Sequence, residues 1–148
     1  MAHPFYPNGN PRLNHVAMSL DAGLLDATGR ADLCRFWGAT FGFEELAEMT
    51  VDRHRLVLSC VHWDQFLFLI ADDEPMRCPR MDHFGFSVGS RDELQGVRDR
   101  VAAFREDDDR VDLVDLAVDD QGMLKIHSIY VGYLLPMMAE VQWWEFTP

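Results

Sequence analysis

The sequence predicts an α+β fold made of two tandem βαβββ modules, residues 1–75 and 76–148, that together form one compact domain. Two observations predict it. A strand-like segment at residues 12–20 recurs at residues 80–88, nearly half of the chain later, and each copy is followed by one helix-like stretch and three strand-like runs. A four-stranded sheet with a single helix leaves one face open, and a second copy of the module can cover that face.

The repeated strand is the stronger of the two observations. RLNHVAMSL at residues 12–20 aligns with RMDHFGFSV at residues 80–88, with Arg, His and Ser identical and the other positions chemically close. Chance readily produces alternating apolar residues, but it rarely places Arg, His and Ser in register as well. The alignment therefore puts His15 and His83 at equivalent positions of the two modules.

A helix is expected after each copy of the repeated strand. The first spans about Ala31 to Phe41, with large apolar residues at helical spacing. The second begins with a capping box, Ser90 to Glu93. Its apolar stripe is typical of a helix that packs on a core rather than of a cofactor site, and consists of Leu94, Val97, Val101 and Phe104.

The expected strands of both modules follow the helices. In the first module they cover residues 43–50, 54–62 and 65–71, and in the second residues 110–118, 124–134 and 138–146. Residues 73–79 are expected to link the modules, and the acidic run 106–109 is expected to form a solvated turn.

Composition and charge restrict the partners and the compartment. A formal net charge of −12 argues against nucleic acid or an anionic membrane surface as a partner and leaves a small molecule. The start MAHPFYPNGNPR lacks the pattern of a signal peptide, and no apolar run approaches the roughly 20 residues of a spanning helix. Cys34, Cys60 and Cys78 are odd in number and have no CxxC spacing, which favours a soluble protein of the reducing cytoplasm.

A duplicated βαβββ unit with a histidine on the first strand of each copy resembles the vicinal oxygen chelate superfamily. This superfamily includes glyoxalase I, methylmalonyl-CoA epimerase, extradiol dioxygenases, fosfomycin-resistance enzymes and bleomycin-binding proteins. The resemblance covers nearly the whole chain and is carried by NHVA at 14–17, FWGATFGFE at 36–44 and DHFGFSV at 82–88. It implies the glyoxalase/dioxygenase-like fold, in which both sheets curl into a cup that holds a divalent metal.

The resemblance implies metal ligands on the first and fourth strands of the modules. His15 and His83 match the two first-strand positions. On the last strand, alignment with the family favours Gln142, six residues after Pro136, whereas Glu140 is the better ligand because its charge offsets that of the metal. Both side chains share one face of a regular strand, and Glu140 is narrowly preferred. Fe(II) or Mn(II) is the expected metal, with Zn(II) or Ni(II) as alternatives.

The reaction expected from the resemblance depends on the first module. The run QFLFLIA at 65–71 is apolar where glyoxalase I and the epimerases usually place a ligand, a position that extradiol dioxygenases leave empty. His15, His83 and Glu140 would reproduce the two-histidine, one-carboxylate set of an extradiol dioxygenase acting on a small aromatic chelating substrate.

Two other functions stay open. One is a glyoxalase- or epimerase-type lyase or isomerase that works through an enediolate. The other is a metal-free drug-binding protein, as in bleomycin resistance, because residues 135–138 lack the Asp-Pro-x-Gly turn of many relatives. A homodimer is expected, and either each chain closes its own cup or two chains exchange modules.

Three further residues are candidates for catalysis. His127 could accept a substrate proton, and Tyr130 or Tyr133 could steady a substrate anion. His127 and Tyr130 cannot both face the cup, because residues three apart on a regular strand point to opposite faces. His54 and His62 are expected at the surface or rim, and His3 in solvent. The aromatic residues near the two fourth strands could line an apolar cup, namely Trp63, Phe66, Phe68, Trp143, Trp144 and Phe146.

Overall fold

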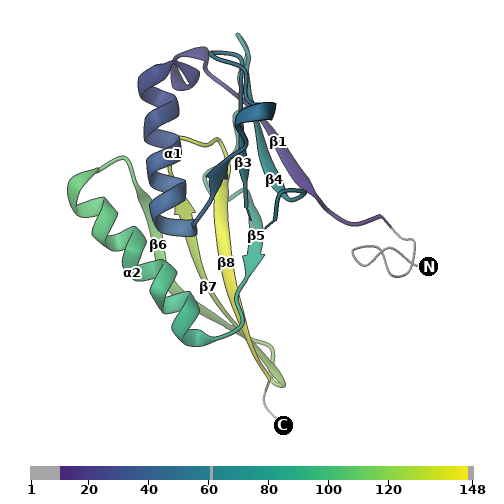
Figure 1. Ribbon diagram of the computed structural model, residues 1–148. Coiled ribbons are helices and arrows are strands. Elements are labelled where there is room, and N and C mark those ends of the chain that lie inside the picture. The colour runs from purple at the N-terminus through teal and green to yellow at the C-terminus, as the bar shows by residue number, and fades with distance from the viewer. Residues whose placement is uncertain (1–10, 61, 147–148) are drawn as a thin grey trace.

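A computed structural model of the protein describes residues 11–60 and 62–146 and contains two βαβββ units (Figure 1). Residues 1–10, which include His3 and most of the amino-terminal segment predicted not to be a signal peptide, lie outside the described residues. The first unit comprises β1 (His15–Leu20), α1 (Ala27–Phe41), β2 (Glu44–Glu45), β3 (Arg55–Ser59) and β4 (Phe66–Ala71), with 3-10 turns at Ala22–Leu25 and Ala47–Met49. The second comprises β5 (His83–Ser87), α2 (Arg91–Asp107), β6 (Asp112–Asp120), β7 (Leu124–Gly132) and β8 (Met138–Phe146).

The two units have the same sheet topology. The strand order is β1-β4-β3-β2 in one sheet and β5-β8-β7-β6 in the other. In each sheet the first and last strands of the unit pair in parallel, and the remaining pairs are antiparallel. The predicted α+β fold with two repeated modules is therefore confirmed, and the repeated histidines begin β1 and β5.

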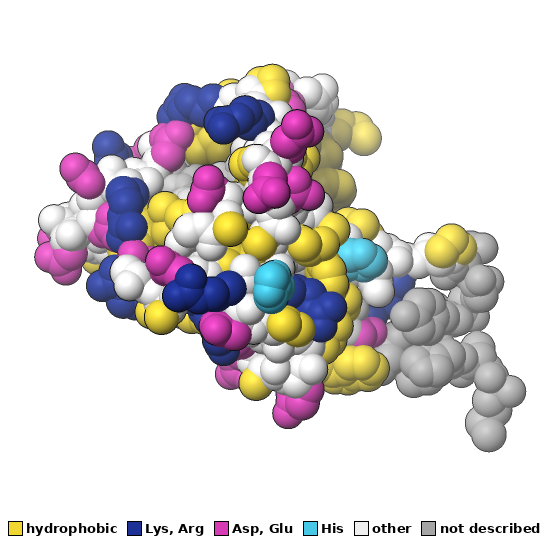
Figure 2. Space-filling view, turned by 90° about the horizontal axis from the view of Figure 1, so that it is seen from above, with side chains coloured by type: hydrophobic (Ala, Val, Ile, Leu, Met, Phe, Trp, Pro, Cys, Tyr) yellow, Lys and Arg dark blue, Asp and Glu magenta, His cyan; other side chains and the backbone are white. Residues whose placement is uncertain are grey.

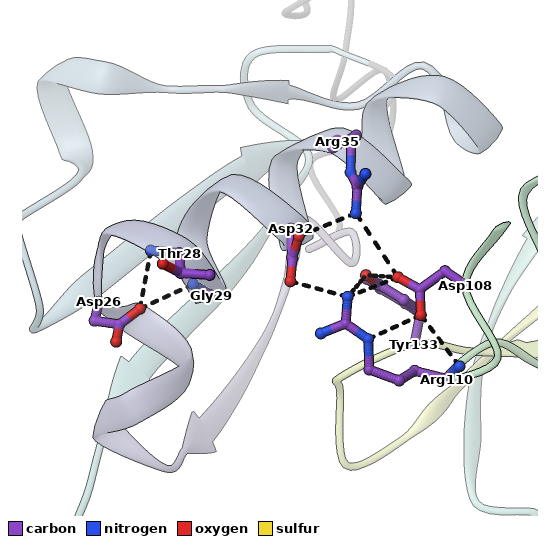
Figure 3. Close-up of polar contacts among 8 residues, drawn as sticks. All are labelled: Asp26, Thr28, Gly29, Asp32, Arg35, Asp108, Arg110 and Tyr133. Carbon is purple, nitrogen blue, oxygen red and sulfur yellow. Dashed lines mark hydrogen bonds and ion pairs between the residues drawn. The ribbon is translucent and has the colours of Figure 1, made fainter.

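Local capping decides where the helices begin. Helix α1 starts at Ala27, four residues before the predicted position, because the carboxylate of Asp26 accepts hydrogen bonds from the backbone N–H groups of Thr28 and Gly29 (Figure 3). Helix α2 has the predicted cap, in which the hydroxyl of Ser90 accepts a hydrogen bond from the N–H of Glu93.

The strand predicted at residues 43–50 is much shorter in the structure, and this is the main difference between the predicted and observed elements. Only Glu44–Glu45 pairs with β3, and the chain then turns. The carbonyl of Leu46 accepts hydrogen bonds from the N–H groups of Met49 and Thr50 and from the Thr50 hydroxyl, which curls this segment away from the sheet.

Helices α1 and α2 lie side by side and cover one face of the sheets (Figure 1). Phe36 of α1 stacks on Tyr133 with a centroid separation of 4.2 Å and meets Phe104 of α2 edge-on at 5.0 Å. The apolar stripe of α2 is buried as predicted at Leu94, Val97 and Val101. The core therefore joins the two units through their helices.

A network of polar side chains lies on the same side of the sheets as the helices (Figure 3). The phenol of Tyr133 donates to Asp108 at 2.7 Å, and Arg110 donates to the Tyr133 oxygen at 2.9 Å and reaches Asp32 of α1 at 2.9 Å. Hydrogen bonds from Arg110 and Tyr133 hold the pKa of the Asp108 carboxyl well below its usual range. The prediction of a solvated acidic turn was thus wrong for Asp108, whose side chain is only 9% exposed.

The surface carries charges of both signs. On the face seen from above in Figure 2, basic and acidic side chains are interspersed and lie beside hydrophobic ones. Within the described part of the chain, no helix combines the length and the apolar character needed to cross a membrane.

Replacing Tyr133 by Phe tests the network. The substitution keeps the ring against Phe36 but removes a buried hydroxyl, so the free energy of unfolding should fall by about 1–2 kcal/mol in urea denaturation. Asp115→Asn is the control, because it breaks only the solvent-exposed ion pair with Arg98 and should change stability little. Equal effects of the two substitutions would contradict a stabilising role for the network.

Candidate metal centre

The face of the second sheet that points away from the helices holds the candidate site. Glu140 on β8 lies opposite Gly85 of β5 on one side and opposite Tyr130 of β7 on the other. Since side chains two apart share a face, His83 lies on this face with Gly85. Strand pairing therefore brings His83, Glu140 and Tyr130 together from three adjacent strands.

His83 and Glu140 form the centre of the site. The imidazole Nε2 lies 3.3 Å from a carboxylate oxygen of Glu140, and Glu140 is only 5% exposed. Gly85 keeps the space beside this carboxylate free, because a Cβ there would lie 3.7 Å from the same oxygen. A buried carboxylate with a histidine beside it is a group that needs a positive partner.

The tautomer of His83 explains what kind of partner is needed. Its Nδ1 lies 2.8 Å from the carbonyl oxygen of Met81, which can only accept, so Nδ1 carries the proton. In the neutral ring Nε2 then has a lone pair that faces the Glu140 carboxylate, and two acceptors 3.3 Å apart attract each other only through a cation. That cation is either a second proton on the imidazole or a metal ion, and a ligating histidine typically has its other nitrogen anchored in this way.

Tyr130 completes the site on the β7 side. Its ring meets His83 edge-on with a centroid separation of 5.1 Å, and the residue lies opposite Glu140 in the strand register. Burial, followed by the influence of the neighbouring Glu140 carboxylate, raises the pKa of the Tyr130 phenol above its usual value, so the group stays protonated at neutral pH. Of the predicted catalytic candidates, Tyr130 is the one that lies beside His83.

Gln142 shares the face but lies further along the strand. It is opposite Ser87 and Ser128 rather than Gly85, and its amide oxygen accepts a hydrogen bond from the indole N–H of Trp144 at 2.9 Å. Between the two alternatives for the last strand, Glu140 is therefore the side chain that the register places next to His83.

The first sheet presents His15 in the equivalent position. His15 is exposed, stacks on Phe66 with a centroid separation of 5.2 Å, and donates from Nδ1 to the side-chain oxygen of Asn14 at 2.8 Å. Ala17 lies opposite Phe68, as Gly85 lies opposite Glu140 in the second sheet. Phe68 thus occupies the place of Glu140, and the apolar character predicted for this strand is present at that position.

The chain is similar to known proteins in three-dimensional structure. No family model and no curated protein matches the chain. FosX, a fosfomycin resistance protein from Listeria monocytogenes, was solved as a glutamate-to-glutamine mutant with Mn(II) and 1S,2S-dihydroxypropylphosphonic acid, and matches with a TM-score of 0.63 and 16% identity over 89% of each chain. Lactoylglutathione lyase from Agrobacterium tumefaciens matches with a TM-score of 0.61 and 15% identity over 90% of this chain and 93% of that one.

A third solved structure is also similar in fold. It is an integron cassette protein from the mobile metagenome of the Halifax Harbour sewage outfall, with a TM-score of 0.60 and 15% identity over 90% of this chain and 98% of that one. FosX and lactoylglutathione lyase both belong to the vicinal oxygen chelate superfamily. This chain has the vicinal oxygen chelate fold. At this level of identity the likeness establishes the fold, and the chemistry must be argued from the residues.

Two predicted catalytic residues lie outside the candidate site of this vicinal oxygen chelate fold. His127 is on the opposite face of β7, where it is paired with Trp143 and donates from Nε2 to Glu145 at 2.7 Å. Tyr133 lies in the helix-side network. His127 and Tyr130 point to opposite faces of β7, as strand alternation predicts, and Tyr130 is the one that faces His83.

The three expected metal ligands, His15, His83 and Glu140, do not lie together within a single chain. Among residues 11–60 and 62–146, no group of three or more His, Cys, Asp or Glu side chains is close enough together to hold a metal ion. His83 and Glu140 form a pair, and His15 belongs to the other sheet. His54 and His62 are exposed, as expected.

The contact between Tyr130 and Glu140 has a measurable consequence. Glu140→Gln should lower the pKa of the Tyr130 phenol, because it removes a negative charge that opposes the phenolate. The measurement is a pH titration of the tyrosine ring-carbon NMR signals. Tyr133 is the internal control, since burial, followed by its bond to Asp108, raises its pKa to about 12 and Glu140 plays no part. An unmoved Tyr130 titration would contradict the contact.

Proposed function

We propose that this protein is an enzyme that depends on a divalent metal and acts on a small molecule which binds the metal through two neighbouring oxygen atoms. The observation that carries the proposal is that His83 Nε2 and a buried Glu140 oxygen face each other at 3.3 Å, a spacing that a bound cation can bridge. The Mn(II) and dihydroxy compound in the FosX complex support it, because they occupy a protein of the same fold.

The proposed ligands are His83, Glu140 and His15. Two imidazoles and a carboxylate suit Fe(II) or Mn(II), with Zn(II) and Ni(II) as alternatives. The Nδ1 of His83 donates to the carbonyl oxygen of Met81, and the Nδ1 of His15 donates to the side-chain oxygen of Asn14. In each neutral ring the Nε2 lone pair is then available to a metal. When bound, such a metal lowers the pKa of a coordinated hydroxyl and orients the reactants.

We propose further that His15 comes from a second copy of the chain, so that a homodimer completes each site. Among residues 11–60 and 62–146, His15 does not come close enough to His83 and Glu140 to form a three-ligand group with them, although it faces the same side as Gly85. Two half-sites in one chain, each with one histidine at the equivalent position, can form two complete sites when two copies associate with two-fold symmetry.

A mixing experiment tests the ligands and the dimer together. His15→Ala and Glu140→Gln should each bind Mn(II) far more weakly than the unchanged protein, because each site loses one of three ligands. Unfolding and refolding the two variants together should restore one intact site in each mixed dimer. Isothermal titration with Mn(II) measures the number of sites.

The matched control is His127→Ala, which removes a histidine on the opposite face and should leave Mn(II) binding unchanged. If neither single variant loses affinity, the proposed ligands are wrong. If both lose it and the mixture regains none, each chain closes its own site.

Within this class we propose extradiol-type dioxygenation of a small aromatic diol as the first reaction. Phe68 supports it, because its position in the first sheet adds no second carboxylate and leaves a two-histidine, one-carboxylate set with open positions for a diol and O₂. The protonated Tyr130 phenol can donate a hydrogen bond to a substrate oxygen. A lyase or isomerase reaction is the second candidate, favoured by the likeness to lactoylglutathione lyase.

Oxygen uptake separates the two reactions. With Fe(II) or Mn(II) and a panel of catechols, the protein should consume one O₂ for each ring opened, with both oxygen atoms in the product and no reductant consumed. Tyr130→Phe should lower kcat by about 10- to 100-fold, the scale on which a positioned proton donor acts. No oxygen uptake together with solvent deuterium exchange into a hemithioacetal substrate would favour the lyase instead.

The proposed compartment is the cytoplasm. Cys34, Cys60 and Cys78 are free thiols in the structure. Burial raises the pKa of Cys34 to about 11 and that of Cys60 to about 12, so both thiols stay protonated and unreactive. Free, unreactive thiols support a reducing environment.

A further inference from the structure

A small cavity lies where the first strands of the two modules approach each other. Its volume is about 120 Å³, and its wall includes residues of β1, of β4 and of β5. The cavity is partly open to solvent, because the exposed residues Leu13, His15 and Gly85 form part of its wall. The wall is formed mainly by apolar side chains, with the aromatic rings of Phe66, Phe84 and Phe86.

The cavity extends through the sheet edges rather than lying on one face. His15, Phe66 and Gly85 belong to the face that carries the candidate metal centre, whereas Val16 and Phe84 point to the helix side. Because residues of both faces line it, the cavity lies between the edges of β1 and β5. It borders the face that carries the candidate metal centre.

The polar groups of the wall are few. Asn14, His15 and Gln65 are the polar side chains that line the cavity, and none of the lining residues is an Asp, Glu, Lys or Arg. Gly85 joins the cavity to the metal centre, because a Cβ at this position would lie 3.7 Å from the Glu140 carboxylate. The cavity and the candidate metal centre are therefore neighbours, with Gly85 common to both.

We propose that this cavity binds a single aromatic ring and so selects the apolar part of the ligand. An enclosed apolar protein cavity of roughly 150 Å³ is known to accept benzene. The space here is about 120 Å³ and is partly open to solvent, which gives a ring a way in. The three phenylalanine rings offer edges and faces for ring packing. The assignment of the ring to a substrate rests on the proposed function, but binding of the ring itself does not.

Fluorobenzene is the probe, titrated into the metal-free full-length protein and followed by ¹⁹F NMR. It should bind saturably and be displaced by benzene but not by naphthalene, whose two fused rings exceed the cavity. Cys60 lies in the wall, so Cys60→Leu should weaken binding by about tenfold or more by filling the space.

Cys34→Leu is the matched control, because Cys34 is also half-buried but lies beside Glu45, outside the cavity. It should bind fluorobenzene as the unchanged protein does. Non-saturable binding, displacement by naphthalene, or equal binding by the Cys60→Leu variant would overturn the proposal. If Cys60→Leu fails to fold, the size selection of the unchanged protein decides.

Titration with Mn(II) distinguishes this inference from the proposed function. Cys60→Leu should keep Mn(II) binding, and His83→Ala should lose it while keeping fluorobenzene binding. Fluorobenzene binding without any Mn(II) binding by the unchanged protein would overturn the metal centre and support the cavity. The reverse pattern would overturn the cavity and leave the metal centre standing.

Discussion

The parallel pairing of β5 with β8 is the constraint on which the candidate site depends. This register places Glu140 opposite Gly85 and within 3.3 Å of His83. A slip of one residue would turn Glu140 to the helix side and expose a core residue, because side chains alternate between the faces of a strand. The apolar residues next to Glu140 in sequence, Ala139 and Val141, are fully buried under the helices and hold the strand in this register.

The two modules share a backbone plan but differ in the chemistry of the same position. Phe68 stands in the first sheet where Glu140 stands in the second. The first sheet therefore contributes an exposed histidine on an aromatic surface, and the second contributes a buried carboxylate and a phenol. Under the proposed function, a metal held by the carboxylate would bind the oxygen atoms of a ligand, and the aromatic surface of the first sheet would contact its apolar part.

Tyr130 and Tyr133, near the end of β7, lie on opposite faces of the sheet, one beside the candidate site and one in the helix-side network. Tyr130 lies against His83 and Glu140 on the open face, where its phenol borders the candidate site. Tyr133 stacks on Phe36 and donates to Asp108 on the helix side, where it connects the second unit with α1. An odd spacing along the chain separates the two environments, since it reverses the direction of the side chain.

The repeat, the two helices and the positions of His15 and His83 follow from the sequence alone, because local periodicity and an internal alignment contain that information. Local pattern could not decide between Glu140 and Gln142, which share a face, or between His127 and Tyr130, which do not. The tertiary structure places Glu140 and Tyr130 beside His83 and His127 beside Glu145, because these contacts depend on the register between strands distant in sequence. The cavity between β1 and β5 also comes from tertiary packing, since it lies where strands of two different sheets meet.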